Sequence, residues 1–331
     1  MSGVQQKQVA RGEAGMRLDR WFKTHFPQIT HGRLEKLLRT GQVRIDGARA
    51  KAADRLEQGQ VIRIPPLGEA AAVEKAPPRA RTVSAADAKF VRALVIHKDA
   101  EVLVLNKPAG LAVQGGTGTE RHLDGLLDAL AFDAPERPRL VHRLDKDTSG
   151  VLLLARSRAA AAALAKAFAE RTTRKVYWAL TAGVPKVSRG QIDLKLLKAG
   201  AEGSERMRAL LEGEDAEEAK RAVTRYVTLD HAAHRVAWMA LMPVTGRTHQ
   251  LRAHMAALGT PIVGDGKYGG ASARLTGGEI ENRLHLHARQ IAIAHPAGGT
   301  LVAEAPLPPH MVRSWALFGF DPETRGDPFA P

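Results

Sequence analysis

Residues 140–154 read LVHRLDKDTSGVLLL, a polar turn followed at once by an apolar run. A short apolar run bounded by turn residues predicts a buried strand. Asp145 lies in the turn between two cationic residues, Arg143 and Lys146, and the hydroxyl residues 148–149 can hydrogen-bond the turn and keep it rigid. The stretch therefore predicts a buried strand whose preceding turn presents a carboxylate, the alternative being a salt-bridged Asp in an ordinary capped turn.

Strands also predominate on both sides of this segment. Two helices are predicted among them, an Ala-rich run from Ala159 to about Glu170 and the run RTHQLRAHMAAL at 247–258, which ends before Gly259. The charged stretch 198–220 predicts a long mobile insertion between strands. Because strands and helices do not alternate regularly, we expect an α+β domain with a mixed, mostly antiparallel sheet flanked by helices and loops. The expected strands are at 102–105, 150–157, 174–183, 222–230, 235–244 and 285–296.

Composition limits the kind of protein this is. The 331 residues include 49 Lys or Arg and 35 Asp or Glu, a net charge of +14. A surface this basic attracts polyanions, above all nucleic acid, although a merely solubilising surface is the alternative. There is no cysteine, which excludes disulfides and thiolate chemistry. Because the N-terminus has no signal-peptide pattern and no apolar run approaches the roughly 18 residues that span a bilayer, we expect a cytoplasmic protein without membrane contact.

The first fifth of the chain predicts a separate basic module. Residues 1–66 contain thirteen Lys or Arg and six Asp or Glu, which is half of the net charge. Two amphipathic helices are predicted at 16–26 and 31–41, then a strand at 42–46, a turn at Asp46-Gly47 and a strand at 61–64. Cations on the exposed faces suit a phosphate backbone, with a solvated charged face as the alternative. These cations are Arg17, Arg20, Lys23, Arg33, Lys36, Arg39 and Arg44.

The length predicts about two domains, joined by a segment rich in Pro and Ala. We expect residues 1–15 to be a disordered N-terminus and residues 318–331 a flexible tail. Between them lie the basic module at 16–66, the linker at 67–88 and the large second domain at 89–317.

Three further segments carry polar residues of types used in catalysis. In LNKPAGLAVQGG at 105–116, Lys107 follows a strand and the glycines allow a ligand to approach closely, although an ordinary turn has the same residues. In KVYWA at 175–179, strand alternation puts Tyr177 on the same face as Lys175. The third segment, PVTGRTHQLRAHMAALGTPIVGDGKYG at 243–269, is expected to begin a helix, whose N-terminus favours anions. Its first turns are expected to contain Arg247, His249, Arg252 and His254.

The histidines do not have the spacing of a metal site. His249 and His254 are five residues apart, about 140° around a helix, so they do not share a face. His285 and His287 can point the same way from a strand, but no acidic third ligand is near them in sequence. A serine hydrolase is disfavoured because TSG lacks the glycine that precedes the nucleophile. We expect no metal or other cofactor, with a metal-dependent hydrolase acting on nucleic acid as the alternative.

Together these motifs resemble those of the RluA-type pseudouridine synthases, which act on uridines in structured RNA. The resemblance is carried by NKPAGL, HRLDKDTSG, KVYWA, TGRTHQLRAHM with PIVGDGKYG, and RLHLHA. The module at 16–66, with its GQVRIDG signature, resembles the αL RNA-binding domain of ribosomal small-subunit protein four. The sequence QGGTG, its spacing to HRLD, and RLHLHARQIAIAHP are most similar to the RluC branch, which modifies large-subunit ribosomal RNA.

The resemblance implies an isomerase without a cofactor, in which uracil leaves the ribose, turns and reattaches through ring carbon 5. Asp145 matches the family's catalytic Asp, which must be ionised, and Arg252 matches the arginine that pairs with it. Tyr177 matches the aromatic residue that stacks on the flipped base and is the candidate for moving protons. Arg143 matches the residue that occupies the place of the extruded uridine.

Further residues are expected to contact the base or the RNA. Leu284 or Leu286 would close the other face of the pocket, and Lys107, Arg247 and His249 would contact RNA together with the cations of the N-terminal module. RNA is the expected partner, and we expect a monomer. A synthase directed at transfer RNA and a non-catalytic RNA-binding assembly factor stay as alternatives, and the target uridines are left open.

Overall fold

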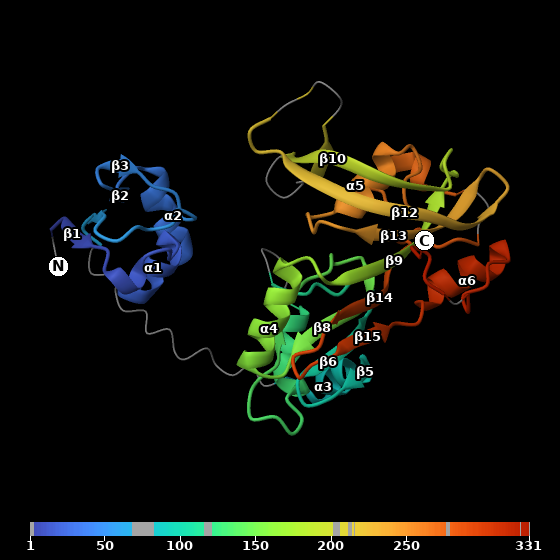
Figure 1. The fold of residues 1–331 in the computed structure, drawn as a ribbon, viewed down its shortest axis with the longest axis horizontal. Helices are drawn as coiled ribbons and strands as arrows, with labels where there is room; N and C mark the ends of the chain where they lie inside the picture. The colour runs from blue at the N-terminus through green and yellow to red at the C-terminus, as the bar shows by residue number, and fades with distance from the viewer. Residues whose placement is uncertain are drawn as a thin grey trace. The chain divides into compact units, whose positions relative to one another are not determined.

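The computed structural model describes residues 3–67, 83–115, 121–200, 206–210, 214, 216–275, 279–324 and 326–330. The chain divides into two compact units, Met1–Thr82 and Val83–Pro331, which we call the N-terminal unit and the C-terminal unit (Figure 1). Residues 68–82 of the expected linker lie outside the described residues, and helix α3 (Ala85–Ala93) begins within its last part. The predicted linker is therefore too long at its C-terminal end. No helix in the described ranges has the length and apolarity needed to cross a membrane.

Two helices and a four-stranded sheet form the N-terminal unit. Helices α1 (Leu18–His25) and α2 (His31–Arg39) lie at the expected positions, and α2 begins where the Thr30 hydroxyl accepts a hydrogen bond from the Arg33 N–H. Trp21 and Phe22 of α1 are buried in one cluster with Ile62 of the sheet. The strands pair in the order β1-β4-β2-β3, with β1 at Gln5–Gln8, β2 at Arg44–Ile45, β3 at Ala48–Arg49 and β4 at Val61–Ile64.

Residues 5–13 contain a strand and a 3-10 helix, contrary to the predicted disorder of the N-terminus. Strand β1 pairs antiparallel with β4, and the 3-10 helix η1 (Arg11–Glu13) follows it. The Glu13 carboxylate accepts hydrogen bonds from the Ala10 N–H and Trp21 Nε1 and pairs with His25. The Ala10 hydrogen bond is the largest of the effects that together lower the pKa of Glu13 to about 2. The prediction failed because QQKQ has no apolar alternation, and β1 is held through its backbone instead.

An eleven-stranded sheet runs through the C-terminal unit (Figure 1). Its strands pair in the order β11-β10-β12-β13-β9-β14-β8-β6-β5, with β7 paired to β8 and β15 to β14. Among the described strands, every pairing is antiparallel except that of β8 with β14. The predicted α+β fold with a mixed, mostly antiparallel sheet is confirmed.

The strands of this sheet include the predicted ones with shifts of a few residues at their ends. Their bounds are β5 Val95–Lys98, β6 Val102–Lys107, β7 Arg139–Leu140, β8 Ser149–Ala155, β9 Arg174–Ala182, β10 Arg189–Ala199, β11 Arg206–Ala209, β12 Lys220–Ala232, β13 Val236–Pro243, β14 Leu286–Ala294 and β15 Thr300–Glu304. The Ala-rich helix is α4 (Arg158–Ala169), close to its predicted position.

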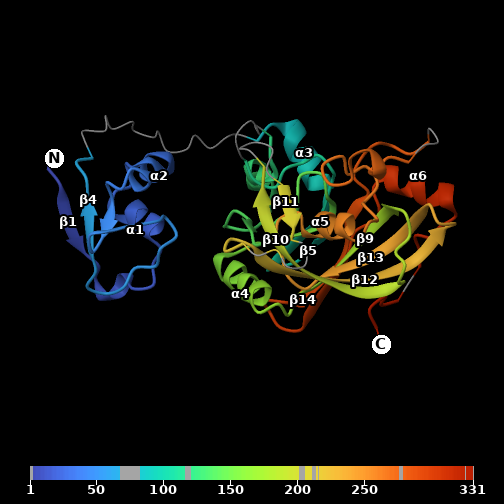
Figure 2. The same ribbon diagram turned by 90° about the horizontal axis from the view of Figure 1, so that it is seen from above.

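Alternation along β13 sends its side chains into two separate cores. Trp238 packs on one face with Trp315 of α6 (Pro309–Phe318). Met239 packs on the other face with Met255 of α5 (Gln250–Ala257). Helix α5 contacts β10, β12 and β13, and Figure 2 shows it beside these strands. Helices α5 and α6 therefore pack on opposite faces of β13. This packing fixes the position of the first turn of α5 relative to the sheet.

Strand β8, which follows the Asp145 turn, is buried on both faces, as predicted. Leu153 packs against α4, whereas Leu154 packs with the 3-10 helix η2 (Leu123–Leu130). Gly150 permits the parallel pairing with β14, because its φ is +110° and a Cβ there would lie 2.2 Å from the carbonyl oxygen of Ala288. The turn before β8 is therefore anchored in the middle of the sheet.

Two segments that were expected to be mobile contribute to the fold. In the 198–220 stretch, β10 continues to Ala199 and β11 pairs antiparallel with it; residues 201–205, 211–213 and 215 lie outside the described residues. In the C-terminal tail, Phe320 is buried beside Trp315, and Asp327 pairs with Arg174. The predictions were wrong for the described parts of both segments, because backbone pairing and isolated apolar or ionic contacts leave no periodic pattern in a sequence.

Candidate active site

A cavity of about 450 Å³ lies beside the turn that precedes β8. One wall is this turn, and a second is the end of α4 with the start of β9. The third wall is the loop that leads from β13 into α5, and Leu286 of β14 completes the lining. In the described part of the chain, Asp145 is the one acidic residue that lines this cavity.

The Asp145 carboxylate lies near other polar groups but forms no hydrogen bond with them in the described structure. Its side chain is 22% exposed, and within the described residues it accepts no hydrogen bond. The one basic group within 4 Å of it there is His249, whose Nε2 lies 3.9 Å from Oδ2. Neither Arg143 nor Lys146, its cationic neighbours in sequence, forms an ion pair with it. The arrangement is a carboxylate whose oxygens are available to a ligand.

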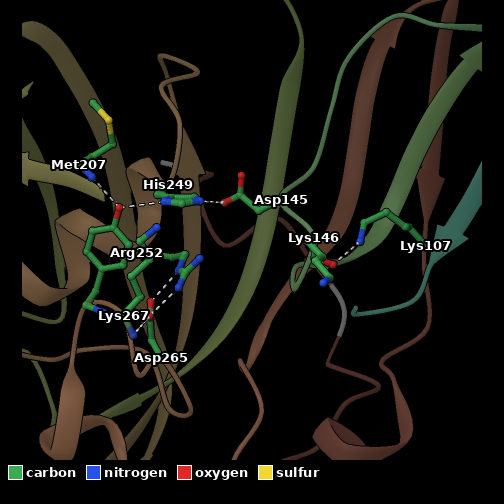
Figure 3. Close-up of polar contacts among 9 residues, drawn as sticks. Lys107, Asp145, Lys146, Met207, His249, Arg252, Asp265 and Lys267 are labelled. Atoms are coloured by element: carbon green, nitrogen blue, oxygen red, sulfur yellow. Dashed lines mark hydrogen bonds and ion pairs between the residues drawn. The ribbon is translucent and has the colours of Figure 1, made fainter. Parts of the chain in front are cut away.

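Lys107 hydrogen-bonds the turn from the protein interior and does not face the solvent. Its side chain is fully buried, and Nζ donates to the backbone carbonyls of Pro108 (3.0 Å) and Leu111 (2.9 Å). It also donates to the carbonyl of Lys146 at 2.9 Å (Figure 3). Burial lowers the pKa of Lys107 to about 8, partly opposed by the acidic residues of the turn. The predicted contact of Lys107 with RNA is therefore wrong, because its three donors are already used to position the residues around Asp145.

The hydroxyl residues after the turn also differ from the prediction. Ser149 hydrogen-bonds His287 Nδ1 at 2.9 Å, which ties β8 to β14 rather than rigidifying the turn. The Thr148 backbone N–H donates to the carbonyl of Asp145 at 3.2 Å, but its hydroxyl is buried with no hydrogen-bond partner in the described structure. Thr148 is one of the residues that line the cavity.

Arg252 does not pair with Asp145, contrary to the prediction. Its Nε and Nη2 donate to the two carboxylate oxygens of Asp265, both at 2.7 Å (Figure 3). Burial lowers the pKa of Arg252, but the hydrogen bonds and charge of Asp265 outweigh burial and raise it. Asp145 also favours the cationic form of Arg252 through its charge, across space and without direct contact.

Asp265 is the acidic site residue that the sequence motifs did not single out. It is almost fully buried and accepts hydrogen bonds from the backbone N–H groups of Lys267 (3.2 Å) and Tyr268 (3.1 Å) as well as from Arg252. Gly264 just before it has a φ of +77°, and a Cβ there would lie 1.9 Å from the carbonyl oxygen of Arg283. The available signal was an acidic residue between two glycines in PIVGDGKYG.

His249 links Asp145 to this second cluster. It precedes α5 in a left-handed conformation with a φ of 50°, so the helix begins three residues later than predicted and Arg247 lies outside it. Its Nδ1 lies 2.9 Å from the hydroxyl of Tyr268, which also accepts a hydrogen bond from the Met207 N–H at 2.8 Å (Figure 3). If Tyr268 donates to Nδ1, the neutral ring carries its proton on Nε2, toward Asp145. Burial lowers the pKa of His249, and the charge of Asp145 partly opposes this.

An aromatic and an aliphatic side chain border the cavity near Asp145. Tyr177 of β9 and Leu286 of β14 come from paired strands, in which Ala288 lies opposite Tyr177. Burial, with a smaller effect from the charge of Asp145, raises the pKa of the Tyr177 phenol, so it stays protonated at neutral pH. Leu284, the other predicted candidate, does not line this cavity and is buried in a core cluster. The pair Tyr177 and Leu286 can therefore hold a planar ring next to a carboxylate.

Comparison with known proteins agrees with this geometry. The family model for RNA pseudouridylate synthase matches residues 101–257, which include the Asp145 turn, Tyr177 and Arg252. "Ribosomal large subunit pseudouridine synthase C" of Escherichia coli K12 is 35% identical over 90% of this chain and 92% of its own. "RNA pseudouridine synthase 4, mitochondrial" of Arabidopsis thaliana is 34% identical over 92% of this chain and 80% of its own. The chain belongs to the RNA pseudouridylate synthase family.

A solved relative supports the fold of this synthase as well. The structure of human RNA pseudouridylate synthase domain containing 4 is 32% identical, with a TM-score of 0.59 over 70% of this chain and 95% of its own. The predicted RluA-type family membership, pseudouridine synthase fold and enzyme class are thereby confirmed.

The remaining predicted cations of the synthase fall into two groups. Arg143 is exposed at the cavity and has no partner among the described residues, whereas Arg247 lines the cavity and donates to the carbonyl of Arg221. In the N-terminal unit, Arg17 pairs with Asp19, and Arg33 and Arg44 donate to backbone carbonyls. Four of the predicted cations of this unit, Arg20, Lys23, Lys36 and Arg39, are exposed and have no partner in its described part.

The buried histidines of the synthase serve its core. His285 lies within hydrogen-bond distance of the Arg283 carbonyl and the Ser314 hydroxyl. His287 lies within hydrogen-bond distance of the Ser149 hydroxyl and the Ala305 carbonyl. Burial lowers the pKa of both to about 4, so both rings are neutral at pH 7. In the described ranges no three His, Asp or Glu residues are grouped so that they could hold a metal ion.

Proposed function

We propose that this synthase converts specific uridines of large-subunit ribosomal RNA to pseudouridine, with Asp145 as the nucleophile. The observation that carries the proposal is the Asp145 carboxylate, which has no hydrogen bond in the described structure and lies in a cavity with Tyr177 and Leu286. The reaction is an isomerisation: the bond from ribose to N1 breaks, a bond to C5 forms, and the C5 proton is replaced by one on N1. It therefore needs a nucleophile and a proton path.

The cavity suits a uridine that has been extruded from its RNA. Tyr177 stacks on one face of the base and Leu286 closes the other, which offsets part of the few kcal/mol that unstacking costs. Because its phenol stays protonated, Tyr177 acts as a proton donor or relay rather than as a phenolate base. Arg143, exposed and unpaired in the described structure, takes the place that the base vacates.

Ribosomal RNA is favoured as the substrate by two observations. Relatives from Escherichia coli and Vibrio cholerae, 35% and 36% identical, carry names that refer to the ribosomal large subunit. The N-terminal unit, which we propose to be an RNA-binding domain of the ribosomal small-subunit protein four type, presents exposed unpaired cations such as Arg20, Lys36 and Arg39 in its described part.

Mapping pseudouridines in the RNA of a strain that lacks the gene tests both the activity and the substrate. We expect the loss of one or more pseudouridines from large-subunit ribosomal RNA, restored by the wild-type gene and by Asp147→Asn but not by Asp145→Asn. Asp147 is a matched control because it is an exposed carboxylate in the same turn. Loss confined to transfer RNA would reject the substrate, and restoration by Asp145→Asn would reject the nucleophile.

The role of the N-terminal unit is tested separately by the salt dependence of RNA binding. Replacing Arg20, Lys36 and Arg39 together by Gln removes three potential phosphate contacts. The slope of log K against log salt concentration should then fall by about 2 to 3, because roughly 0.7 to 0.9 counterions are released per neutralised phosphate. An unchanged slope, with the unit shown to be folded by circular dichroism, would mean that these side chains do not contact RNA.

A further inference from the structure

The cavity extends beyond the place proposed for the base, along the segment that joins α4 to β9. Arg171, Thr173 and Lys175 line this part, and all three alternate in sequence with residues that do not line it. Lys175 and Tyr177 lie two residues apart on the same face of β9, about 7 Å along the strand. Whatever occupies this part of the cavity therefore lies next to the proposed base site.

The charge in this part of the cavity is uncompensated. Lys175 is half-buried, yet its ammonium group has no hydrogen bond or ion pair among the described residues, and the exposed guanidinium of Arg171 has none either. Burial lowers the pKa of Lys175. Lys175 also helps burial to lower the pKa of His142, another cavity residue, to about 3. A cation that is withdrawn even partly from water is usually compensated by a counter-charge, which a ligand can supply here.

A neutral hydrogen-bond donor lies in the same place. The Thr173 side chain is 9% exposed, and its hydroxyl is buried with no partner in the described structure. Leaving such a group without a hydrogen bond is energetically unfavourable. Its neighbour Thr172, which does not line the cavity, donates its hydroxyl to the carbonyl of Ala167 at 3.2 Å. The unsatisfied hydroxyl is therefore specific to the residue that faces the cavity.

We propose that Arg171, Thr173 and Lys175 form a subsite for a backbone phosphate of the substrate, next to the nucleotide whose base is flipped. A phosphate oxygen accepts hydrogen bonds from a hydroxyl, an ammonium group and a guanidinium, and its charge compensates Lys175. The carboxylate of Asp145 is the only negative charge lining the cavity in the described chain, so an anion meets little repulsion at this end. The inference rests on the proposed function, since it assigns the phosphate to the RNA on which the enzyme acts.

Binding of uridine 3′,5′-bisphosphate and of uridine to the full-length protein tests the subsite without turnover. We expect the wild type to bind the bisphosphate at least about tenfold more tightly than uridine, as measured by calorimetry or by ³¹P NMR. Lys175→Met should abolish most of this preference, Lys175→Arg should keep it, and Thr173→Val should reduce it about threefold. Affinity for uridine should change little, because the base site is intact.

Matched controls distinguish the subsite from general charge and from misfolding. Lys186→Met removes an exposed lysine outside the cavity, and Thr172→Val removes the hydroxyl that is already satisfied; both should keep the wild-type preference. A wild type without preference for the bisphosphate, or a folded Lys175→Met protein that keeps it, would overturn the subsite. Failure of the proposed function is a separate result, because it would appear as unchanged pseudouridines in the deletion strain while the bisphosphate preference persists.

Discussion

Two aspartates lie within one network of this synthase, and their surroundings are opposite. Asp265 is almost fully buried and accepts four hydrogen bonds, two from Arg252 and two from backbone N–H groups. Asp145 is partly exposed and accepts none among the described residues, with the Nε2 of His249 3.9 Å away. The difference separates a carboxylate used for structure from one left available for chemistry.

The comparison shows how the fold keeps a carboxylate near cations without pairing it. The guanidinium of Arg252 is occupied by Asp265, and the ammonium of Lys107 is occupied by backbone carbonyls. The charge of Asp145 still favours the cationic form of both residues through space. A direct salt bridge would occupy the carboxylate oxygens of Asp145 and leave them unavailable to a ligand.

The largest expected effect is the loss of turnover in Asp145→Asn with no loss of stability. The release of tritium from ribosomal RNA labelled at uridine C5 should fall by at least about 10³-fold, because the amide cannot act as the nucleophile. The unfolding midpoint should stay within a few degrees of the wild type, since the carboxylate holds nothing in place. Wild-type tritium release from this variant would remove Asp145 from its proposed role.

Asp265→Asn should show the reverse pattern, in which stability falls first. The free energy of unfolding in urea should drop by about 3–5 kcal/mol, because the buried guanidinium of Arg252 loses its counter-charge. The double variant Arg252→Met with Asp265→Leu should be less destabilised than the sum of the single variants. Strict additivity in this cycle would mean that the two residues do not stabilise each other.

Lys107→Met should loosen the turn that holds Asp145. We expect a loss of about 2 kcal/mol in the free energy of unfolding, because three backbone carbonyls lose a charged donor. Tritium release should fall by about 10- to 100-fold, since the carboxylate is no longer held in position. Faster hydrogen exchange of the Thr148 amide, which donates to the carbonyl of Asp145, reports the loosening directly. Unchanged exchange together with reduced release would point to a different role.

The smallest expected effect is on the pH dependence of turnover. At low pH Asp145 should become ion-paired, as Asp265 already is. Burial lowers the pKa of His249, so its ring is neutral at pH 7 and becomes cationic only on acidification below its ordinary value. The cationic ring then pairs with Asp145, and tritium release at saturating RNA should fall several-fold as the pH is lowered below 6.5, the ordinary pKa of a histidine. In His249→Gln this decline should be weaker. A pH profile identical to that of the wild type would exclude His249 as its cause.

Local patterns in the sequence predicted most of the strands and helices. The period of two in β13 and the apolar run of β8 are properties of short segments, so they can be recognised without knowing what packs against them. Strand β1 and the tail with Phe320 and Asp327 could not be recognised, because their contacts are made by backbone groups or by single residues distant in sequence.

For the site, the sequence by itself determined which residue types are present and that Asp145 precedes a buried strand. Only the tertiary structure decided how their charges are paired. Arg252 is able to reach more than one carboxylate, and the burial of Asp265 behind Gly264 makes that residue its partner. The sequence likewise predicted that Lys107 contacts RNA, but its side chain is buried and donates to the carbonyl of Lys146 in the turn. Pairing depends on distance and desolvation, which are set by the packing of β6, β8 and α5 and have no counterpart in the order of residues along the chain.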